Sequence, residues 1–169
     1  MNNKKLGKQF SKIYDQYINK IYRFAYIKVN SQEVAEDITS RVFLNGWESF
    51  QKNPGKIENP SAFLYQIARN LVVDYYREKG KAQFVPAESL SQLADSSIGI
   101  EEKAIINADL ATVRQALSTL KDDYQNVVIW HYLDEMPIRD VAKLLDRSEE
   151  ATRVLLHRAL SSLRQNLTS

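Results

Sequence analysis

Residues 59–77 read NPSAFLYQIARNLVVDYYR. After the Asn59-Pro60 dipeptide, which breaks regular structure, apolar residues recur at the three- and four-residue spacing of a helix. One face of this helix is apolar and predicts a buried stripe: Leu64, Ile67, Ala68, Leu71 and Tyr75. The opposite face carries Gln66, Arg69, Asn70, Val73 and Arg77. Because guanidinium and amide groups bind phosphates and base edges, this second face is a candidate nucleic-acid surface.

Aromatic residues flank that face. Tyr65 and Tyr76 either stack on unpaired bases, as in single-strand binding, or pack into the core. The loop before the helix offers amide side chains and free backbone that are able to receive an extruded base, although the pattern alone is a weak signal. Its candidate residues are Lys52, Asn53, Lys56 and Asn59.

Helical spacing extends in both directions from this stretch. It predicts helices over residues 10–29, 32–50 and 61–79, with Ser31 as the N-cap of the second. Residues 80–99 lose the periodicity and are rich in serine, which is typical of a linker. Further helices are predicted from residue 101 onward and over 124–133, 137–145 and 149–167. We therefore expect an all-α protein: two small helical domains, 1–79 and 101–169, joined by a flexible linker at 80–100.

The last two predicted helices form a second candidate nucleic-acid surface. Pro137 suits the first turn of a short helix, a three-residue turn follows, and Ser148 caps a longer helix. A short helix, a tight turn and a longer helix with basic residues on its outer face are typical of a helix-turn-helix, although a plain helical hairpin looks similar. The basic residues lie opposite an inward face of Thr152, Leu156, Ala159, Leu160 and Leu163; they are Arg147, Arg153, His157 and Arg158.

Composition excludes several classes of protein. The 169 residues contain no cysteine and only two histidines, His131 and His157, so a disulfide scaffold, a catalytic thiol and a cysteine-ligated zinc site are excluded. We expect no metal, no cofactor and no small-molecule substrate. We also expect a cytoplasmic protein without membrane insertion, because no targeting segment or long apolar run is visible.

The net charge of +2 is low for a DNA-binding protein, but its distribution is uneven. Residues 1–79 carry 13 Lys and Arg against 8 Asp and Glu, a net of +5, whereas residues 80–169 carry 10 against 13, a net of −3. A basic front half favours contact with an anion such as nucleic acid, and an ordinary solvated surface is the alternative.

Taken together, three motifs make the chain resemble the extracytoplasmic-function sigma factors of bacterial RNA polymerase, over about residues 10–166. The first is residues 59–77. The second is Ala35-Glu-Asp-Ile38 with Val42-Phe-Leu44 and Trp47, and the third is residues 138–145 followed by His157-Arg158-Ala159 and Leu163-Arg164.

The resemblance implies a non-enzymatic subunit that binds core RNA polymerase and promoter DNA, with a probable anti-sigma factor as a further partner. Glu36 and Asp37 would dock on polymerase, residues 52–60 would hold a base flipped from the −10 element, and the polar face of residues 66–77 would hold the −10 strand. The −35 element would be read by Arg147, Arg153, His157 and Arg158.

The chain departs from the family pattern at two places. Ser40 and Arg41 stand in the docking helix where the family has glutamine and an acidic residue, and Leu155 replaces a usual arginine in the recognition helix. A stand-alone helix-turn-helix regulator that uses only residues 101–169 is a second hypothesis. An enzyme is a third, but no phosphate-binding loop, metalloprotease motif or catalytic triad supports it.

Overall fold

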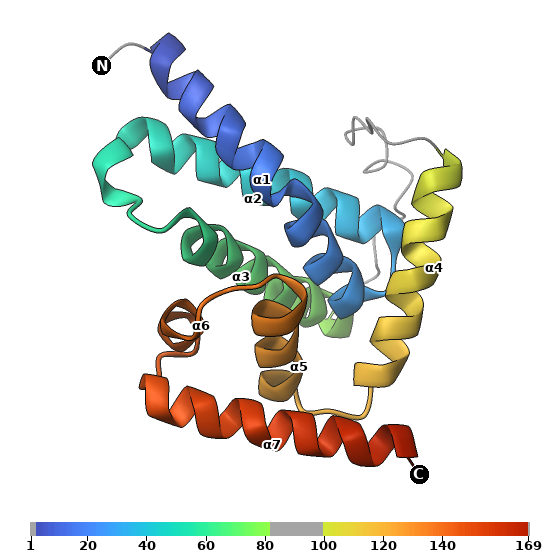
Figure 1. Ribbon diagram of the computed structural model, residues 1–169. Helices are drawn as coiled ribbons and strands as arrows, with labels where there is room; N and C mark the ends of the chain where they lie inside the picture. The colour runs from blue at the N-terminus through green and yellow to red at the C-terminus, as the bar shows by residue number, and fades with distance from the viewer. Residues whose placement is uncertain (1–2, 82–99, 169) are drawn as a thin grey trace. The chain divides into compact units, whose positions relative to one another are not determined.

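The computed structural model describes residues 3–81 and 100–168, and every regular element within these two ranges is a helix (Figure 1). This confirms the all-α fold expected from the spacing of the apolar residues. The chain divides into two compact units, Met1–Asn107 and Ala108–Ser169. The expected linker, 80–100, has residues 80, 81 and 100 in helices, and its remaining residues lie outside the described ranges.

In the first unit three long helices pack against one another: α1 (Asn3–Val29), α2 (Gln32–Lys52) and α3 (Pro60–Lys81). A short 3-10 turn, η1 (Pro54–Lys56), separates the last two. Figure 1 shows α1 and α2 side by side, with α3 below them. The core holds large side chains from all three helices that are almost fully buried: Ile21, Phe24, Val42, Leu64 and Tyr65.

The joint between α1 and α2 is a two-residue turn. Asn30 adopts a positive φ of 54°, which asparagine tolerates better than most residues. Ser31 then caps α2 as the sequence predicted, because its Oγ accepts a hydrogen bond from the backbone N–H of Val34 at 3.3 Å.

Gly46 lies where side chains of the other two helices come close to α2. A Cβ at this position would lie 3.2 Å from Cδ2 of Leu64 and 3.5 Å from Cζ of Phe10. The ring of Phe10 also contacts that of Trp47 in a tilted arrangement, with a centroid distance of 5.3 Å. Since side chains of α1 and α3 converge on α2 here, a small residue at position 46 allows the three helices to meet.

We expect Gly46→Val to destabilise the first unit by about 1–3 kcal/mol, because the added methyl groups would enter occupied space. Gly7→Ala is the matched control: nothing lies within 4 Å of its Cβ position, so the gain in helix propensity should raise stability by about 0.5–1 kcal/mol. Urea denaturation followed by circular dichroism measures both changes. A neutral Gly46→Val would contradict the tight packing.

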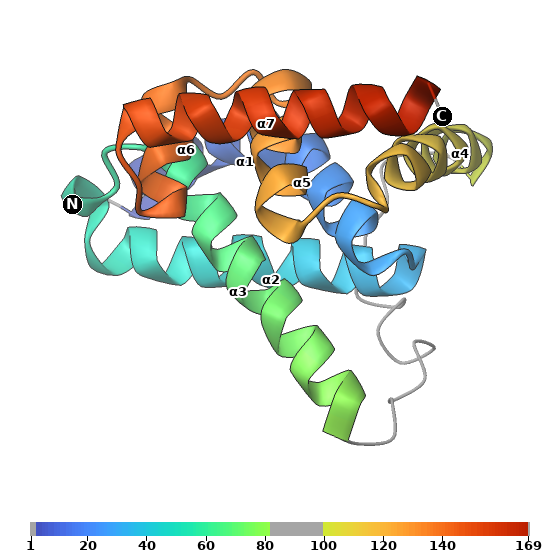
Figure 2. The same cartoon turned by 90° about the horizontal axis from the view of Figure 1, so that it is seen from below.

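The second unit consists of the end of α4 (Ile100–Leu117), then α5 (Asp122–Val128), a π-helical turn η4 (Ile129–Leu133), α6 (Ile138–Leu145) and α7 (Glu149–Thr168). Figures 1 and 2 both show α5 and α6 next to one another along α7. The amide of Gln125 joins α5 to the end of α4, donating to the carbonyls of Leu117 at 3.0 Å and Leu120 at 3.2 Å. The core contains Val127, Ile129, Trp130, Val141, Thr152 and Ala159.

The sequence predicted one regular helix over residues 124–133, but the structure begins it at Asp122 and changes it to a π-turn at Ile129. The N–H of Asp134 bonds to the carbonyl of Ile129 at 3.0 Å, a five-residue span. The N–H of Met136 then bonds to the carbonyl of Trp130 at 2.9 Å, so the wider turn closes onto the next loop. His131 lies at this boundary, half-buried, with Nδ1 2.9 Å from the carbonyl oxygen of Met136.

Candidate nucleic-acid interface

The turn between α6 and α7 has the tight geometry expected of a helix-turn-helix. Asp146 adopts a left-handed conformation with φ 53°, and the N–H of Arg147 bonds back to the carbonyl of Ala142 at 3.0 Å. Ser148 then caps α7, as predicted, because its Oγ accepts from the N–H of Ala151 at 3.0 Å. One expectation was wrong in detail: Pro137 precedes α6 as its N-cap residue and does not lie in its first turn.

The faces of α7 are divided as the sequence predicted. Thr152, Leu156 and Ala159 are buried, and the basic residues of the opposite face are exposed: Arg153, His157 and Arg158. Leu155 is only 8% exposed, so it belongs to the hydrophobic core. The replacement of the family's arginine by Leu155 therefore adds an apolar core contact on the flank of α7.

Two of the basic residues carry acidic partners. Nη2 of Arg147 lies 2.9 Å from Oδ2 of Asp123 on α5, and both side chains are about two-fifths exposed. Nη2 of Arg153 lies 3.8 Å from Oε1 of Glu149, one helical turn earlier. Because exposed pairs of this kind are weak, both guanidinium groups remain available to exchange a carboxylate for a phosphate.

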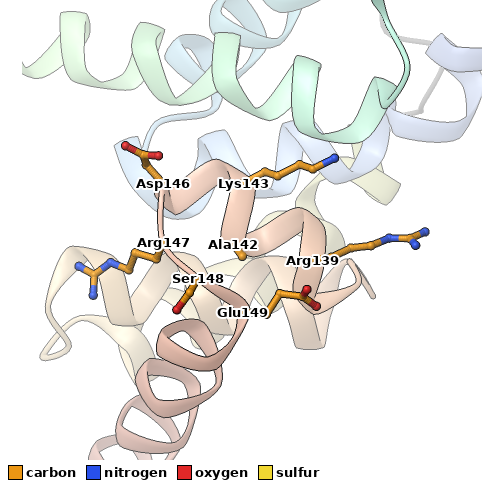
Figure 3. Close-up of a pocket in the computed structure, with 7 residues that line it drawn as sticks. All are labelled: Arg139, Ala142, Lys143, Asp146, Arg147, Ser148 and Glu149. Carbon is orange, nitrogen blue, oxygen red and sulfur yellow. The ribbon is translucent and has the colours of Figure 1, made fainter.

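A shallow cavity of about 470 Å³ lies at the helix-turn-helix turn (Figure 3). Three of its lining residues are cationic: Arg139 and Lys143 from α6, and Arg147 from the turn. Figure 3 shows Arg139 and Lys143 extending to one side of the turn and Arg147 to the other. Asp146 and Glu149 also line the cavity, so the charge there is mixed.

Arg139 and Lys143 were missed by the sequence analysis, which considered only the apolar face of this short helix. Their signal was available, since they are four residues apart and lie on the side of α6 opposite its buried residues. In helix-turn-helix proteins the first helix crosses the DNA backbone, which is where cations at these positions contact phosphates.

The polar face of α3 is exposed along most of its length. Gln66, Asn70 and Arg77 are exposed and Arg69 is half-buried, all on the side away from Leu64 and Ala68. Two local contacts order this face. Nε2 of Gln66 donates to Oδ1 of Asn70 at 3.2 Å, and Nη1 of Arg77 lies 3.7 Å from Oδ1 of Asp74.

The aromatic residues of α3 differ from one another. Tyr65 is fully buried, with its ring edge-on to that of Phe24 at a centroid distance of 5.6 Å, so of the two alternatives it packs into the core. Tyr76 is 45% exposed, and its hydroxyl donates to the backbone carbonyl of Lys28 at the end of α1. Tyr76 therefore joins two helices while its side chain stays partly exposed.

The segment that was predicted to hold a flipped base lies between α2 and α3. Lys52 ends α2 and Asn53 follows as its C-cap, both exposed. Asn59 caps α3, because its Oδ1 accepts from the N–H of Ala62 at 3.2 Å. The cap leaves the amide NH₂ of Asn59 for another partner. Lys56 lies in η1, and the structure describes only its backbone.

The predicted polymerase-docking residues share α2. Asp37 is buried, and Nε of the exposed Arg41 lies 3.0 Å from its Oδ2, so these two residues form an internal ion pair. Glu36 and Ser40 are half-buried, and Oε1 of Glu36 accepts from Nε2 of Gln32 at 3.2 Å.

Leu44 belongs to the second motif of the sequence analysis but was not named among the docking residues. It is 63% exposed, the most exposed of the large apolar side chains in the described residues.

The described residues include no helix of the length and hydrophobicity that crossing a membrane requires. The same residues contain no group of three or more His, Cys, Asp or Glu placed to hold a metal ion.

Two family models match the chain: Sigma-70 region 2 over residues 13–82 and Sigma-70, region 4 over residues 110–163. The ECF RNA polymerase sigma factor SigW of Bacillus subtilis is 28% identical over 170 residues, which cover 94% of this chain and 88% of SigW. The RNA polymerase sigma factor YlaC of the same organism is 28% identical over 160 residues, covering 92% of this chain and 90% of YlaC.

Among solved structures, CnrH in complex with the cytosolic domain of CnrY matches with a TM-score of 0.67. The match covers 96% of this chain and 89% of CnrH at 16% sequence identity. At that identity the likeness shows a shared fold.

Proposed function

The chain belongs to the extracytoplasmic-function sigma factors of bacterial RNA polymerase, and from this premise we propose which of its surfaces carry each part of initiation. As a sigma factor it binds core RNA polymerase and promoter DNA, and it directs transcription initiation at specific promoters. The proposals concern the residues, the promoter elements and the regulation.

The outer face of α7 reads the −35 element in the major groove. The observation that carries this assignment is the exposure of Arg153, His157 and Arg158 opposite the buried face of a capped second helix. Arginine reaches phosphates or guanine edges from such a helix. Arg147 and the α6 residues Arg139 and Lys143 contact the flanking phosphates, where Arg147 exchanges Asp123 for a phosphate oxygen.

The polar face of α3 holds the −10 strand. Gln66, Asn70 and Arg77 are exposed and Arg69 is half-buried, and the partly exposed ring of Tyr76 provides a surface on which a base stacks. Residues 52–60 receive a base flipped out of the duplex, with the amide NH₂ of Asn59 as one donor.

The exposed side of α2 docks on core polymerase. Arg41 neutralises Asp37 at 3.0 Å, so the family's acidic docking surface is here partly replaced by an internal pair. Glu36, Ser40 and the exposed Leu44 complete the contact. We infer that apolar burial of Leu44 supplies affinity that the lost carboxylate does not.

We expect Leu44→Asp to lower the affinity for core polymerase about tenfold or more, because a buried interface leucine contributes on the order of 1–2 kcal/mol and the new carboxylate would be desolvated. Fluorescence anisotropy of labelled protein titrated with core enzyme measures this. Val73→Asp is the matched control, since Val73 is 49% exposed in the same unit but lies on α3. Equal losses in the two variants would contradict a docking role for Leu44.

The remaining assignments complete the proposal. The protein acts in the cytoplasm and has no catalytic residue of its own. Residues 1–79 perform docking and −10 recognition, and residues 101–169 perform −35 recognition. A protein partner of the anti-sigma kind sequesters it; this is supported by the complex of CnrH, which shares the fold, with the cytosolic domain of CnrY.

Run-off transcription with purified core polymerase on fragmented genomic DNA, followed by sequencing of the start sites, tests the function. We expect a limited set of promoters that share two upstream sequence elements. Transcripts that share no element, or that are equal with and without the protein, would overturn the proposal. Binding of the holoenzyme to fragments that carry only the upstream element is the control, because it measures −35 recognition without −10 recognition.

A further inference from the structure

Val154 is an apolar residue on the outer, polar face of α7. It is 46% exposed. Helical spacing places Val154 on one face with three exposed residues. Glu150 lies four residues before it, His157 three residues after it and Arg158 four residues after it. A β-branched residue is a poor helix former, so an exposed valine here gives nothing to the stability of α7.

The position of Val154 along α7 is the one that reaches bases. In a helix-turn-helix the N-terminal residues of the second helix contact base edges. Val154 lies in the second turn of a helix that begins at Glu149. The core side of this turn is formed by Leu155 and Leu156, which are 8% and 9% exposed, so the helix cannot rotate Val154 inward without exposing them.

The major groove offers one apolar group to such a side chain. Each base pair displays a pattern of donors and acceptors, and only thymine adds a methyl group, at C5. The flanking His157 and Arg158 are able to bind acceptors and phosphates, but Val154 has no polar atom in its side chain. Its complementary partner on a base edge is therefore the thymine methyl.

We propose that Val154 packs against the C5-methyl group of a thymine in the upstream promoter element and selects a T·A pair at that position. The proposal rests on the assignment of α7 to the major groove and deepens it by naming one base and the group that is read. The contact is specific to this chain, because it depends on an exposed valine that shares one face of α7 with His157 and Arg158.

The test uses the complete holoenzyme, core polymerase plus this chain, and a promoter found by the run-off experiment. Each thymine of the upstream element is replaced in turn by deoxyuridine, which lacks only the methyl group. At one position we expect about a fourfold loss of promoter affinity, the equivalent of about 0.8 kcal/mol for one buried methyl group. Val154→Ser should show a similar loss on the unmodified promoter and no further loss on the deoxyuridine promoter.

Two controls keep the result interpretable. Ser161→Ala changes an exposed residue on the same face of α7, two turns further on, and should keep the full deoxyuridine effect. The thermal melting temperature of Val154→Ser should equal that of the wild type, since the side chain is exposed.

Each outcome of this experiment either supports or overturns the proposed thymine contact. Non-additive losses for Val154→Ser and one deoxyuridine support the proposal. Additive losses, no sensitivity to deoxyuridine at any position, or an upstream element without thymine would overturn it while leaving the proposed function intact. Loss of core-polymerase binding in Val154→Ser would assign the residue to a protein contact instead. If the wild type gave no promoter-specific transcript, the proposed function and this inference would fail together.

Discussion

Replacing Arg158 with alanine is expected to weaken binding of the holoenzyme to its promoter by about tenfold to a hundredfold, or about 1–3 kcal/mol. Arg158 is exposed in the third turn of α7, three residues after the buried Leu155 and four residues after the exposed Val154. A guanidinium there forms two parallel hydrogen bonds with a guanine edge or a phosphate, and alanine removes both without disturbing the fold.

The pattern of affinity losses across promoter variants shows whether Arg158 contacts a base or the DNA backbone. If Arg158 reads a base, Arg158→Lys should be nearly as weak as Arg158→Ala on the cognate promoter, because an ammonium group lacks the planar fork. Competition binding against single-base variants of the upstream element should then show relaxed preference at one position. Equal loss on all promoter variants would contradict base reading and assign Arg158 to the backbone.

Lys143 provides the comparison within the same unit. It lines the cavity at the turn, on the helix that we assign to the DNA backbone. Lys143→Ala should weaken binding uniformly across promoter variants. It should also reduce the slope of log affinity against log salt concentration by about 0.9, the value for one phosphate contact. A changed sequence preference in Lys143→Ala would contradict a backbone role.

Helical spacing in the sequence was sufficient to predict the main surfaces. Thr152, Leu156 and Ala159 of α7 are buried as predicted, and Ser31 and Ser148 are caps. This worked because a helix longer than four turns can bury only one stripe, so its polar residues are left on the other side. In α3 the predicted stripe is only partly correct: Leu64 and Ala68 are buried, Ile67, Leu71 and Tyr75 are half-buried, and Val72 is buried in addition.

The sequence analysis was incomplete where the surroundings of a side chain depend on its neighbours in the fold. Tyr65 was left open between stacking and packing, and its ring packs edge-on against Phe24 of α1, a contact that the spacing within α3 does not show. Asp37 stays a predicted docking residue, and Arg41 pairs with it on the same helix, a contact that the i to i+4 spacing already allowed. Leu155 was treated as a lost base contact, although it lies next to the buried stripe of α7.

The π-turn at Ile129–Leu133 carries the last prediction, which concerns Trp130. Its side chain is fully buried in the second unit, and its backbone carbonyl accepts a hydrogen bond from the N–H of Met136. Packing therefore fixes the ring and the hydrogen bond fixes the backbone. Trp130→Ala should destabilise this unit by about 3–5 kcal/mol, since removal of a large buried ring leaves a cavity that neighbours fill only in part. A unit of this size rarely has more stability than that to lose.

The chain makes the measurement selective, because its two tryptophans lie one in each unit, Trp47 on α2 and Trp130 on η4. In Trp130→Ala and in the reference variant Trp130→Phe, fluorescence therefore reports on the first unit alone, while circular dichroism reports on both. We expect Trp130→Ala to lose part of its helical signal at low urea while the Trp47 transition stays in place. Tyr132→Ala, in the same π-turn but 51% exposed, should match the wild type within about 0.5 kcal/mol.

The functional consequence separates the two units. Trp130→Ala should still bind core polymerase through α2, because that helix belongs to the first unit, but it should lose discrimination at the upstream promoter element. Loss of the Trp47 transition together with the helical signal would show that the units unfold as one. Unchanged promoter discrimination with a melted second unit would contradict the assignment of α7 to −35 reading.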